Sequence, residues 1–313
     1  MQLKKIDLNG LIIPNNLFLA PLAGYTNAVF RATCLNLGAG LAFTEMVSAK
    51  GLCYKSENTR QLLQLTPEYG AVNAVQLFGS EPEYLEKAAC GEELAPFELI
   101  DINMGCPVPK IFKNGEGSAL LNDIPLAQKL VRAAAKSGKK VSVKFRIGVD
   151  GGHIVTRDFA VAMQDAGAAM LTIHGRTRDK MYSGEVNFKE IASAKAAVEI
   201  PVIANGGVFC NADAERLINE TGADGVMVAR GAMYNPFVFA EISGAPVGDK
   251  KAVVQRQLNE TFAAYGSRFA TVYMRKMLSF YIKGRQGAAE YRVKLMRAES
   301  KEEIESILNE LDF

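Results

Sequence analysis

The sequence predicts an α/β protein: a (β/α)8 TIM barrel followed by a small C-terminal all-helical domain. Eight short runs of apolar and β-branched residues alternate with helical patterns, which is typical of βα units and a parallel sheet. The chain has 313 residues, enough for a barrel of about 250 residues and an appendage. After a Gly- and Pro-containing linker at 242–248, apolar residues recur at helical spacing. We therefore expect a barrel over residues 1–243 and a helical domain over residues 250–313.

The strands are expected where apolar runs are bounded by turn residues. They are Leu17–Ala20, Leu41–Met46, Val72–Phe78, Glu98–Met104, Val141–Ile147, Met170–His174, Val202–Asn205 and Gly225–Ala229. The helices expected between them include Ala28–Leu37, Glu81–Cys90, Pro125–Lys136, Arg157–Ala166 and Asn211–Glu220. Glycine readily adopts the left-handed conformation that follows many helices. Helix ends are therefore expected at Gly38, Gly91, Gly138, Gly167 and Gly222.

The composition excludes several classes of protein. The formal net charge of +2 is too small for a chain that binds nucleic acid over its whole surface. Five scattered cysteines without a C-x-x-C pair indicate neither a disulfide framework nor a zinc site. The N-terminus has no secretory h-region, and no stretch approaches the ~18 apolar residues of a membrane span. These features predict a soluble cytoplasmic protein that binds neither a metal nor a membrane.

The predicted helical domain differs from the rest of the chain in charge. Residues 251–300 carry ten basic side chains against three acidic ones. A basic helical surface is typical of proteins that bind a phosphate backbone, so we interpret this segment as RNA-binding. The alternative is a solvated helix face with no partner.

In a TIM barrel the active site lies at the C-terminal ends of the strands. Polar residues or glycines stand at nearly every predicted strand end. In chain order these are Pro21-Leu22-Ala23-Gly24, Glu45, Gln76, Asn103 with Cys106, Lys144, His174, Asn205-Gly206-Gly207 and Arg230-Gly231. A barrel used only as a scaffold needs no lysine within an apolar strand, so we expect a functional site here.

Cys106 follows the fourth predicted strand and lies between Gly105 and Pro107. The glycine lets the backbone turn or approach a ligand, and the proline biases the cysteine toward an extended geometry. At the reference pKa of ~8.5 a thiol is mostly protonated at neutral pH, so Cys106 could act as a general acid. The alternative is a small buried apolar residue near a turn.

The loops after the seventh and eighth strands of a barrel commonly bind phosphate. Here they contain Gly206 and Gly207, and Arg230 with Gly231. The glycines let backbone N–H groups approach a phosphate, and the guanidinium adds charge-assisted hydrogen bonds. These loops predict a phosphorylated ligand, although tight turns alone could also require the glycines.

Lys144 would be costly inside a barrel unless an anion compensates its charge. A reduced isoalloxazine ring is such an anion, because negative charge develops near its N1 and O2 atoms. In this interpretation Gln76 and His174 bind the polar edges of the ring, and the backbone of Pro21-Leu22-Ala23 lies against its dimethylbenzene side. A Schiff-base lysine is the competing interpretation, but it leaves Cys106 and Gln76 without a role.

In this order and spacing, the motifs resemble those of the tRNA-dihydrouridine synthases, most closely the bacterial B-type subgroup. The similarity runs from about Leu17 to about Ala298. It rests on Ala20-Pro21-Leu22-Ala23-Gly24-Tyr25-Thr26, Thr44-Glu45-Met46, Gln76-Leu77-Phe78-Gly79, Asp101-Ile102-Asn103-Met104-Gly105-Cys106-Pro107, Lys113-Asn114-Gly115, Ala119-Leu120-Leu121, Val143-Lys144-Phe145-Arg146, His174-Gly175-Arg176-Thr177 and Asn205-Gly206-Gly207.

The resemblance implies FMN in the barrel mouth, NADPH as reductant, and reduction of the C5=C6 bond of uridines in tRNA, with Cys106 as proton donor to C5. It implies flavin contacts by Pro21, Leu22, Ala23, Gln76, Lys144, His174, Asn205, Gly206, Gly207, Ala229 and Arg230. Asn103 and Arg176 would hold a uracil flipped out of the tRNA, and Lys110 and Lys113 would lie on a loop that closes over the nucleotide. A tRNA-binding helical domain and a monomer are also expected.

Three residues differ from the pattern of this family. Asn27 stands where aspartate is usual, Leu22 where methionine is usual, and Met277 where histidine is common. Two competing functions remain open. Dihydroorotate dehydrogenases are FMN barrels that act on the same pyrimidine bond, but their small substrate gives no reason for a basic helical domain. A non-catalytic tRNA-binding module would not account for polar groups that converge on a thiol.

Overall fold

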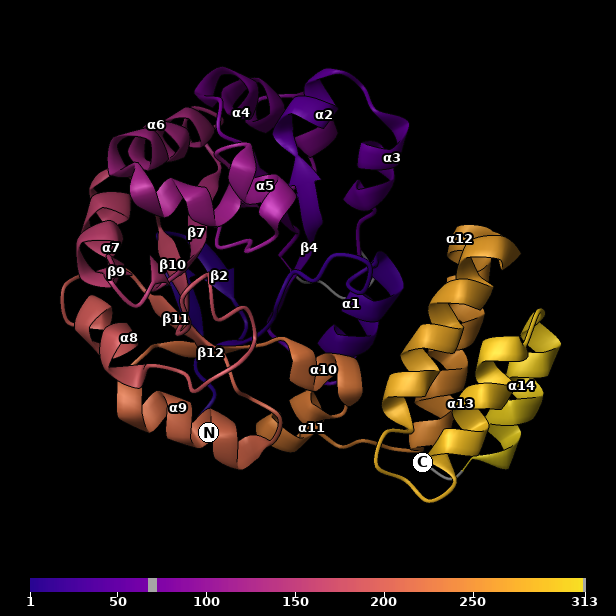
Figure 1. The fold of residues 1–313 in the computed structure, drawn as a ribbon. Coiled ribbons are helices and arrows are strands. Elements are labelled where there is room, and N and C mark those ends of the chain that lie inside the picture. The colour runs from indigo at the N-terminus through magenta and orange to yellow at the C-terminus, as the bar shows by residue number, and fades with distance from the viewer. Residues whose placement is uncertain (67–71, 312–313) are drawn as a thin grey trace.

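The computed structural model describes residues 1–66 and 72–311. Eight parallel strands form a closed barrel in chain order (Figure 1). They are β3 (Leu17–Leu19), β4 (Leu41–Ser48), β5 (Ala74–Phe78), β6 (Leu99–Met104), β7 (Lys140–Arg146), β10 (Met170–His174), β11 (Val202–Asn205) and β12 (Gly225–Val228). β12 pairs with β3 and closes the barrel. The predicted TIM barrel is confirmed. Residues 67–71 and 312–313 of the two predicted domains lie outside the described residues.

The observed strands differ from the predicted ones mainly at their ends. β4 continues two residues beyond Met46 to Ser48, because a register shift between Phe43 and Met46 lets it pair with β5 as far as Phe78. β5 begins at Ala74 instead of Val72. The core position of every predicted strand is confirmed.

Helices surround the barrel on its outer face (Figure 1). The main ones are α1 (Ala28–Asn36), α4 (Pro82–Ala89), α6 (Ile124–Ala135), α7 (Thr156–Asp165), α8 (Phe188–Lys195) and α9 (Asn211–Thr221). Four predicted stop glycines have positive φ: Gly38 (107°), Gly138 (74°), Gly167 (102°) and Gly222 (65°). Helix α4 also ends just before Gly91 as predicted, but Gly91 has a φ of −72° and begins the short 3-10 helix η3 (Glu92–Leu94) instead of adopting the left-handed conformation.

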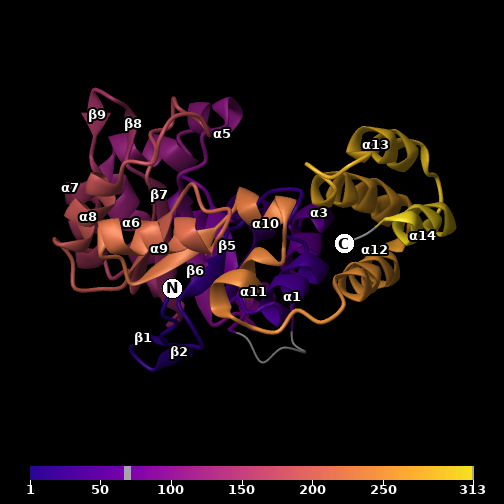
Figure 2. The same cartoon turned by 90° about the horizontal axis from the view of Figure 1, so that it is seen from below.

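Several short elements were not predicted. Two hairpins pair β1 (Ile6–Leu8) with β2 (Leu11–Ile13) and β8 (Gly148–Asp150) with β9 (His153–Ile154). The first hairpin packs Ile6, Leu8 and Ile13 against the residues that begin the barrel strands, and so covers the N-terminal mouth (Figure 2). The additional short helices are α2 (Ala49–Cys53), α3 (Glu57–Arg60), α5 (Pro109–Lys113), α10 (Arg230–Tyr234) and α11 (Val238–Ser243).

Beyond α11 the chain forms α12 (Lys250–Tyr281), α13 (Ala288–Arg297) and α14 (Lys301–Glu310), which lie beside the barrel (Figure 1). α12 is two helical pieces joined at Gly266, where φ is 72°. The Tyr265 hydroxyl accepts a hydrogen bond of 3.0 Å from the backbone N–H of Ala28, and the rings of Tyr234 and Phe280 meet edge to face at 5.4 Å. Within residues 1–66 and 72–311, no helix is both long and apolar enough to span a membrane.

Candidate active site

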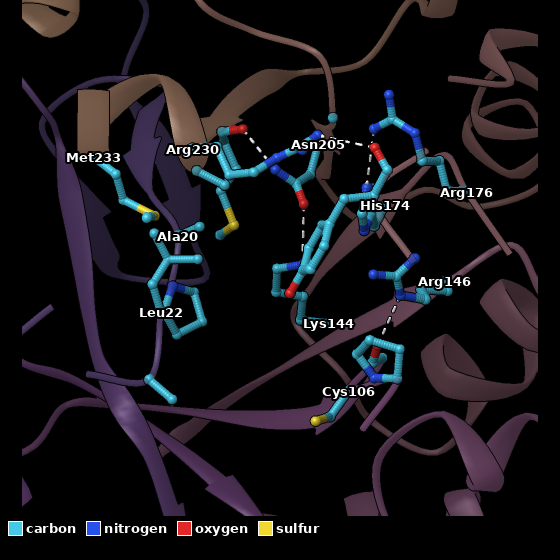
Figure 3. Close-up of a pocket in the computed structure, with 18 of the residues that line it drawn as sticks. Ala20, Leu22, Cys106, Lys144, Arg146, His174, Arg176, Asn205, Arg230 and Met233 are labelled. Atoms are coloured by element: carbon cyan, nitrogen blue, oxygen red, sulfur yellow. Dashed lines mark hydrogen bonds between the residues drawn. The ribbon is translucent and has the colours of Figure 1, made fainter. Parts of the chain in front are cut away.

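A cavity of about 430 Å³ opens at the C-terminal ends of the barrel strands (Figure 3). Most residues predicted for the site line it: Pro21, Leu22, Ala23, Asn103, Cys106, Lys144, His174, Arg176, Asn205, Gly206, Gly207, Ala229 and Arg230. Gln76, Lys110 and Lys113 lie elsewhere. The fold therefore brings most of the predicted residues together from loops that are far apart in the sequence.

Lys144 projects into the cavity from β7, and its Nζ donates a hydrogen bond of 3.1 Å to Asn205 Oδ1 (Figure 3). The amide of Asn205 is fixed in this orientation because its Nδ2 donates to the carbonyl of Met227 at 2.8 Å. Burial, followed by the charge of Arg146, lowers the pKa of Lys144 to about 8. An anion bound in the cavity would offset this cost and hold the ammonium in its charged form.

His174 ends β10 and is surrounded by cations. Burial, followed by the charges of Arg146, Lys144, Arg176 and Arg230, lowers its pKa well below the ordinary value, so the imidazole is neutral at pH 7. Nη1 of Arg176 lies 3.4 Å from His174 Nε2. Because a guanidinium only donates, this contact favours the tautomer with the proton on Nδ1.

The guanidinium of Arg176 also anchors the loop that precedes α8. Its Nε donates to the carbonyls of Ser183 and Gly184 at 3.1 Å, and its Nη2 donates to Gly184 at 2.9 Å. Most of its donors therefore bind the protein backbone. Arg176 shapes the wall of the cavity as well as lining it.

Cys106 is held on three sides in the loop after β6. Its carbonyl accepts hydrogen bonds from the Ser118 backbone N–H (3.1 Å) and hydroxyl (2.8 Å), and Arg146 Nε donates to the adjacent Gly105 carbonyl at 2.9 Å. A Cβ at Gly117 would lie 2.9 Å from Cys106 Cβ, so only glycine fits there. The residue is 9% exposed, and burial raises the pKa of its thiol. Cys106 is therefore a protonated thiol at neutral pH.

Asn103 forms the third anchor of this loop. Its Oδ1 accepts hydrogen bonds from the backbone N–H groups of Gly105 (3.1 Å) and Cys106 (2.9 Å). Its Nδ2 donates to Gln76 Oε1 at 2.8 Å. Gln76 is buried beneath Asn103, because the strand register sets Gln76 opposite Asp101, two residues before Asn103. The structure therefore places Gln76 below the cavity wall.

Two glycines in the predicted phosphate loops have no room for a side chain. At Gly206, where φ is 130°, a Cβ would lie 3.0 Å from Val186 Cγ2 and 3.1 Å from His174 Cδ2. At Gly231 a Cβ would lie 2.3 Å from the carbonyl oxygen of Val208. Arg230 stands over the ring of Tyr182 at 4.9 Å and donates to its carbonyl at 3.3 Å. This cradle of backbone and guanidinium fits a phosphate group.

Lys110 and Lys113 are exposed on α5, outside the cavity. The segment was predicted as a loop, but Pro109 occupies the first turn of a short helix, a position that suits proline. The two residues are therefore exposed to solvent, outside the cavity.

Sequence reasoning assigned no role to Arg146, although it lines the cavity. Besides the Gly105 carbonyl, it donates to the carbonyls of Thr177 (3.0 Å) and Met181 (2.8 Å) and so joins two loops. The available signal was its spacing: it follows Lys144 by two residues on one strand, which puts both on the same face. Met46, Tyr182, Phe209 and Met233 supply further lining.

Of the residues that differ from the family pattern, Asn27 caps α1 with its Oδ1, which accepts a hydrogen bond of 2.9 Å from Phe30 N–H. Leu22 lines the cavity, and Met277 is fully buried, so its side chain is part of the core. Over residues 1–66 and 72–311, no group of three or more His, Cys, Asp and Glu is arranged to hold a metal ion.

Comparison with known proteins identifies the family. A family model described as dihydrouridine synthase (Dus) matches residues 18–312. The probable tRNA-dihydrouridine synthase 1 of a Synechocystis species is 36% identical over 319 aligned positions, covering 98% of this chain and 89% of that protein. The tRNA-dihydrouridine synthase B of Vibrio parahaemolyticus is 34% identical and covers 90% of both chains.

A similarity to solved structures concerns the fold alone. The old yellow enzyme homologue of Zymomonas mobilis superposes with a TM-score of 0.57 at 14% identity, covering 80% of this chain and 94% of that one. The family match and the two relatives extend over nearly the whole chain, barrel and C-terminal helices alike. This chain therefore belongs to the dihydrouridine synthase family.

Proposed function

We propose that this protein reduces the C5=C6 bond of specific uridines in tRNA to 5,6-dihydrouridine, with FMN as bound cofactor and NADPH as reductant. The observation that carries the proposal is a protonated thiol, Cys106, in the wall of a cavity that also holds a lysine in need of an anion and a cradle for a phosphate. The names and extent of the relatives support tRNA as the substrate.

The cavity residues fit FMN. Gly206, Gly207 and Arg230 would hold its phosphate, and Lys144 would compensate the negative charge of the reduced ring. The neutral imidazole of His174 would hydrogen-bond the pyrimidine side of the ring. The remaining proposed contacts are Pro21, Leu22, Ala23, Asn205 and Ala229. When bound, the flavin supplies the hydride that NADPH delivers to the enzyme.

Cys106 gives the proton in this proposal. Its raised pKa keeps Sγ protonated at neutral pH, as a general acid requires. Asn103 and Arg176 line the same cavity and would hold the uracil edge while C5 accepts the proton from Sγ. A base inside folded tRNA cannot reach this depth, so the uridine must be flipped out. Lys110 and Lys113 would then contact its phosphates at the rim.

The C-terminal helices are proposed to bind the tRNA body. A second cavity of about 680 Å³ lies between α10 and these helices, with four cations in its wall. Its charged and aromatic lining residues are Phe209, Arg230, Tyr234, Phe237, Lys250, Tyr281, Lys283 and Arg285. Cations with interleaved aromatic rings suit a phosphate backbone with exposed bases. We further propose a cytoplasmic monomer with residues 250–313 as its tRNA-binding domain.

The direct test is product formation. The purified protein is incubated with FMN, NADPH and tRNA from a strain that lacks dihydrouridine, and nuclease fragments are weighed by mass spectrometry. The wild type and Cys90→Ala, which removes an exposed thiol outside the cavity, should add two hydrogens to a uridine at a defined position. Cys106→Ala should add none. Absence of product with FMN bound would contradict tRNA as the substrate, and failure to bind FMN would contradict the flavin.

A further inference from the structure

A chain of hydrogen bonds connects a buried carboxylate to the loop of Cys106. Asp101, on β6, accepts from Gln76 Nε2 at 2.7 Å through Oδ2 and from the Ser142 hydroxyl at 2.7 Å through Oδ1. Gln76 Oε1 accepts from Asn103 Nδ2 at 2.8 Å. Asn103 Oδ1 accepts from the Cys106 backbone N–H at 2.9 Å. The chain therefore runs from Asp101 through Gln76 and Asn103 to the thiol-bearing residue.

Asp101, at the buried end of this series, determines which group donates and which accepts in each of its hydrogen bonds. An ionised carboxylate only accepts hydrogen bonds, so Gln76 must turn its NH2 group toward Asp101 and its Oε1 toward Asn103. Asn103 must then turn its own NH2 group toward Gln76. Its Oδ1 is left facing the Cys106 loop, where two backbone N–H groups need an acceptor.

If the Gln76 amide turned over, the last contact would fail. Gln76 would present its NH2 group to Asn103, and Asn103 would have to turn its oxygen away from the loop. Its NH2 group would then face the N–H groups of Gly105 and Cys106, donor against donor. Among Asp101, Gln76 and Asn103, the two amides can each turn over and exchange donor and acceptor. The carboxylate of Asp101 accepts in either orientation, so it fixes the other two.

The burial of these polar residues costs free energy, which suggests that they have a role other than stability. Asp101, Gln76 and Ser142 are each at most 1% exposed, and they lie side by side on β6, β5 and β7 in the strand register. Burial, opposed by the hydrogen bonds from Gln76 and Ser142, raises the pKa of Asp101 to about 6. Apolar side chains could fill such a layer without this cost, and replacing buried charges in this way is often neutral or stabilising.

We propose that Asp101 is a positioning residue: by fixing the amide orientations of Gln76 and Asn103, it holds the Cys106 loop in the conformation that sets the thiol against the cavity. Asp101 itself touches neither cofactor nor substrate. The benefit to catalysis rests on the function proposed above. The effect on the reactivity of the Cys106 thiol does not, because these hydrogen bonds form within the protein without cofactor or substrate.

The test is the rate at which iodoacetamide alkylates Cys106 at pH 8, followed by peptide mass spectrometry. Asp101→Ala removes the fixed acceptor and releases one of the three anchors of the loop, so the rate should rise about fivefold, the effect of one hydrogen bond. Asp101→Asn should stay within about twofold of wild type, because its amide oxygen can still accept from Gln76 while its NH2 group faces Ser142, whose hydroxyl can turn to accept.

Ser142→Ala is the matched control. It removes the other hydrogen bond of Asp101 but leaves the path to Cys106 intact, so the alkylation rate should not change. Gln76→Leu cuts the same path one step closer to the thiol and should reproduce the increase, which keeps the test decisive if Asp101→Ala does not fold. Circular dichroism identifies folded variants.

An unchanged Cys106 alkylation rate in folded Asp101→Ala or Gln76→Leu would overturn the proposal. An equal increase in Ser142→Ala would also overturn it, because the effect would then be general loosening of the barrel. With tRNA and NADPH, Asp101→Ala should lower kcat about fivefold and leave the KM for tRNA unchanged, and Asp101→Asn should restore kcat. If wild-type protein reduces no tRNA, the proposed function fails, but the alkylation result still decides the role of Asp101.

Discussion

Individual residues make the cavity strongly electropositive, and this charge favours an anionic ligand. Lys144, Arg146, Arg176 and Arg230 all line it, and burial together with their charges keeps His174 neutral. No acidic side chain lines the same wall within the described residues. Asp101 is close enough to oppose the shift of the Lys144 pKa, but it is buried beneath the cavity floor. A bound anion would therefore stabilise the folded protein as well as take part in chemistry.

Lys144→Met tests this charge. The folded-state pKa of Lys144 is about 8, below its unfolded value of 10.5, so the fold disfavours the ammonium. The cost of burying this ammonium is absent above about pH 10.5, where the lysine is neutral in both states. It grows as the pH falls from 10.5, and it is fully present once the pH has fallen through about 8. Lys144→Met should raise the free energy of unfolding of the cofactor-free protein at pH 7 by about 1–3 kcal/mol and weaken FMN binding at least tenfold.

Urea unfolding and FMN titration measure these two effects. Lys140→Met is the control, since Lys140 begins the same strand at the opposite end of the barrel. A loss of stability in Lys144→Met without bound FMN would contradict the proposed demand for an anion.

Cys106 allows a second prediction at this scale. Because burial raises the pKa of its thiol, alkylation of Cys106 should reach half its maximal rate at a higher pH than alkylation of glutathione. The protonated thiol contributes stability at and below neutral pH, and this contribution is lost as the pH rises through the folded-state pKa. Peptide-resolved alkylation between pH 6 and 11 gives the curve. A half-maximal rate below pH 7 would identify a thiolate nucleophile instead of a general acid.

At the scale of elements, the strand ends and their loops build the site, and the loop before α8 completes it. Arg176 holds the carbonyls of Ser183 and Gly184, and Arg146 holds those of Thr177 and Met181. Val186, from the same loop, packs over Gly206. The phosphate cradle and this loop therefore depend on each other.

Gly206→Ala should disturb both the proposed phosphate cradle and the loop before α8. Its φ of 130° is unfavourable for alanine, and the new Cβ would press on Val186 and His174. We expect a loss of about 1–3 kcal/mol in the free energy of unfolding and weaker FMN binding. Gly138→Ala is the matched control, because Gly138 also has positive φ (74°) but nothing within 4 Å of the added Cβ. It should cost stability alone, and equal FMN affinity in both variants would contradict the role of Gly206.

The sequence predicted elements well where a pattern was long enough to read. The eight strands and the outer helices repeat over many residues, whereas β8 and β9 have three and two residues and leave no periodic signal. Lys110 and Lys113 were predicted to lie on a loop, but Pro109 begins the short helix α5 there. Cys106 and His174 were found because they stand at strand ends, and Lys144 was found because a charge within an apolar strand is costly. The depth of Gln76 could not be found, because it depends on the register between β5 and β6.

At the scale of the whole molecule, the C-terminal helices are attached to the loop that borders the cavity. Lys276 Nζ donates to the carbonyl of Gly24 and lies 4.1 Å from the ring centre of Tyr25. The Tyr273 hydroxyl donates to the carbonyl of Tyr25. The flanking residues Leu22 and Ala23 line the cavity. A tRNA bound on these helices would therefore be held at a fixed distance from Cys106.

The double variant Lys250→Ala/Lys283→Ala removes two cations from the cavity beside α10. We expect the KM for tRNA to rise about tenfold and the dependence of binding on salt to fall by about two units of slope, while flavin reduction by NADPH is unchanged. Lys301→Ala, on α14 and paired with Glu305, is the control. Equal salt slopes in the double variant and wild type would place the tRNA elsewhere.

The central claim is that Cys106 protonates uridine. Separate measurement of the reductive and oxidative half-reactions tests it most directly. Stopped-flow absorbance follows flavin reduction by NADPH and then, in a separate mix, reoxidation of the reduced enzyme by tRNA. Cys106→Ala should leave the first rate within twofold of wild type and slow the second by about 10²–10⁴-fold, the usual contribution of a general acid. Cys90→Ala should change neither. Reoxidation of Cys106→Ala by tRNA at the wild-type rate would contradict the account.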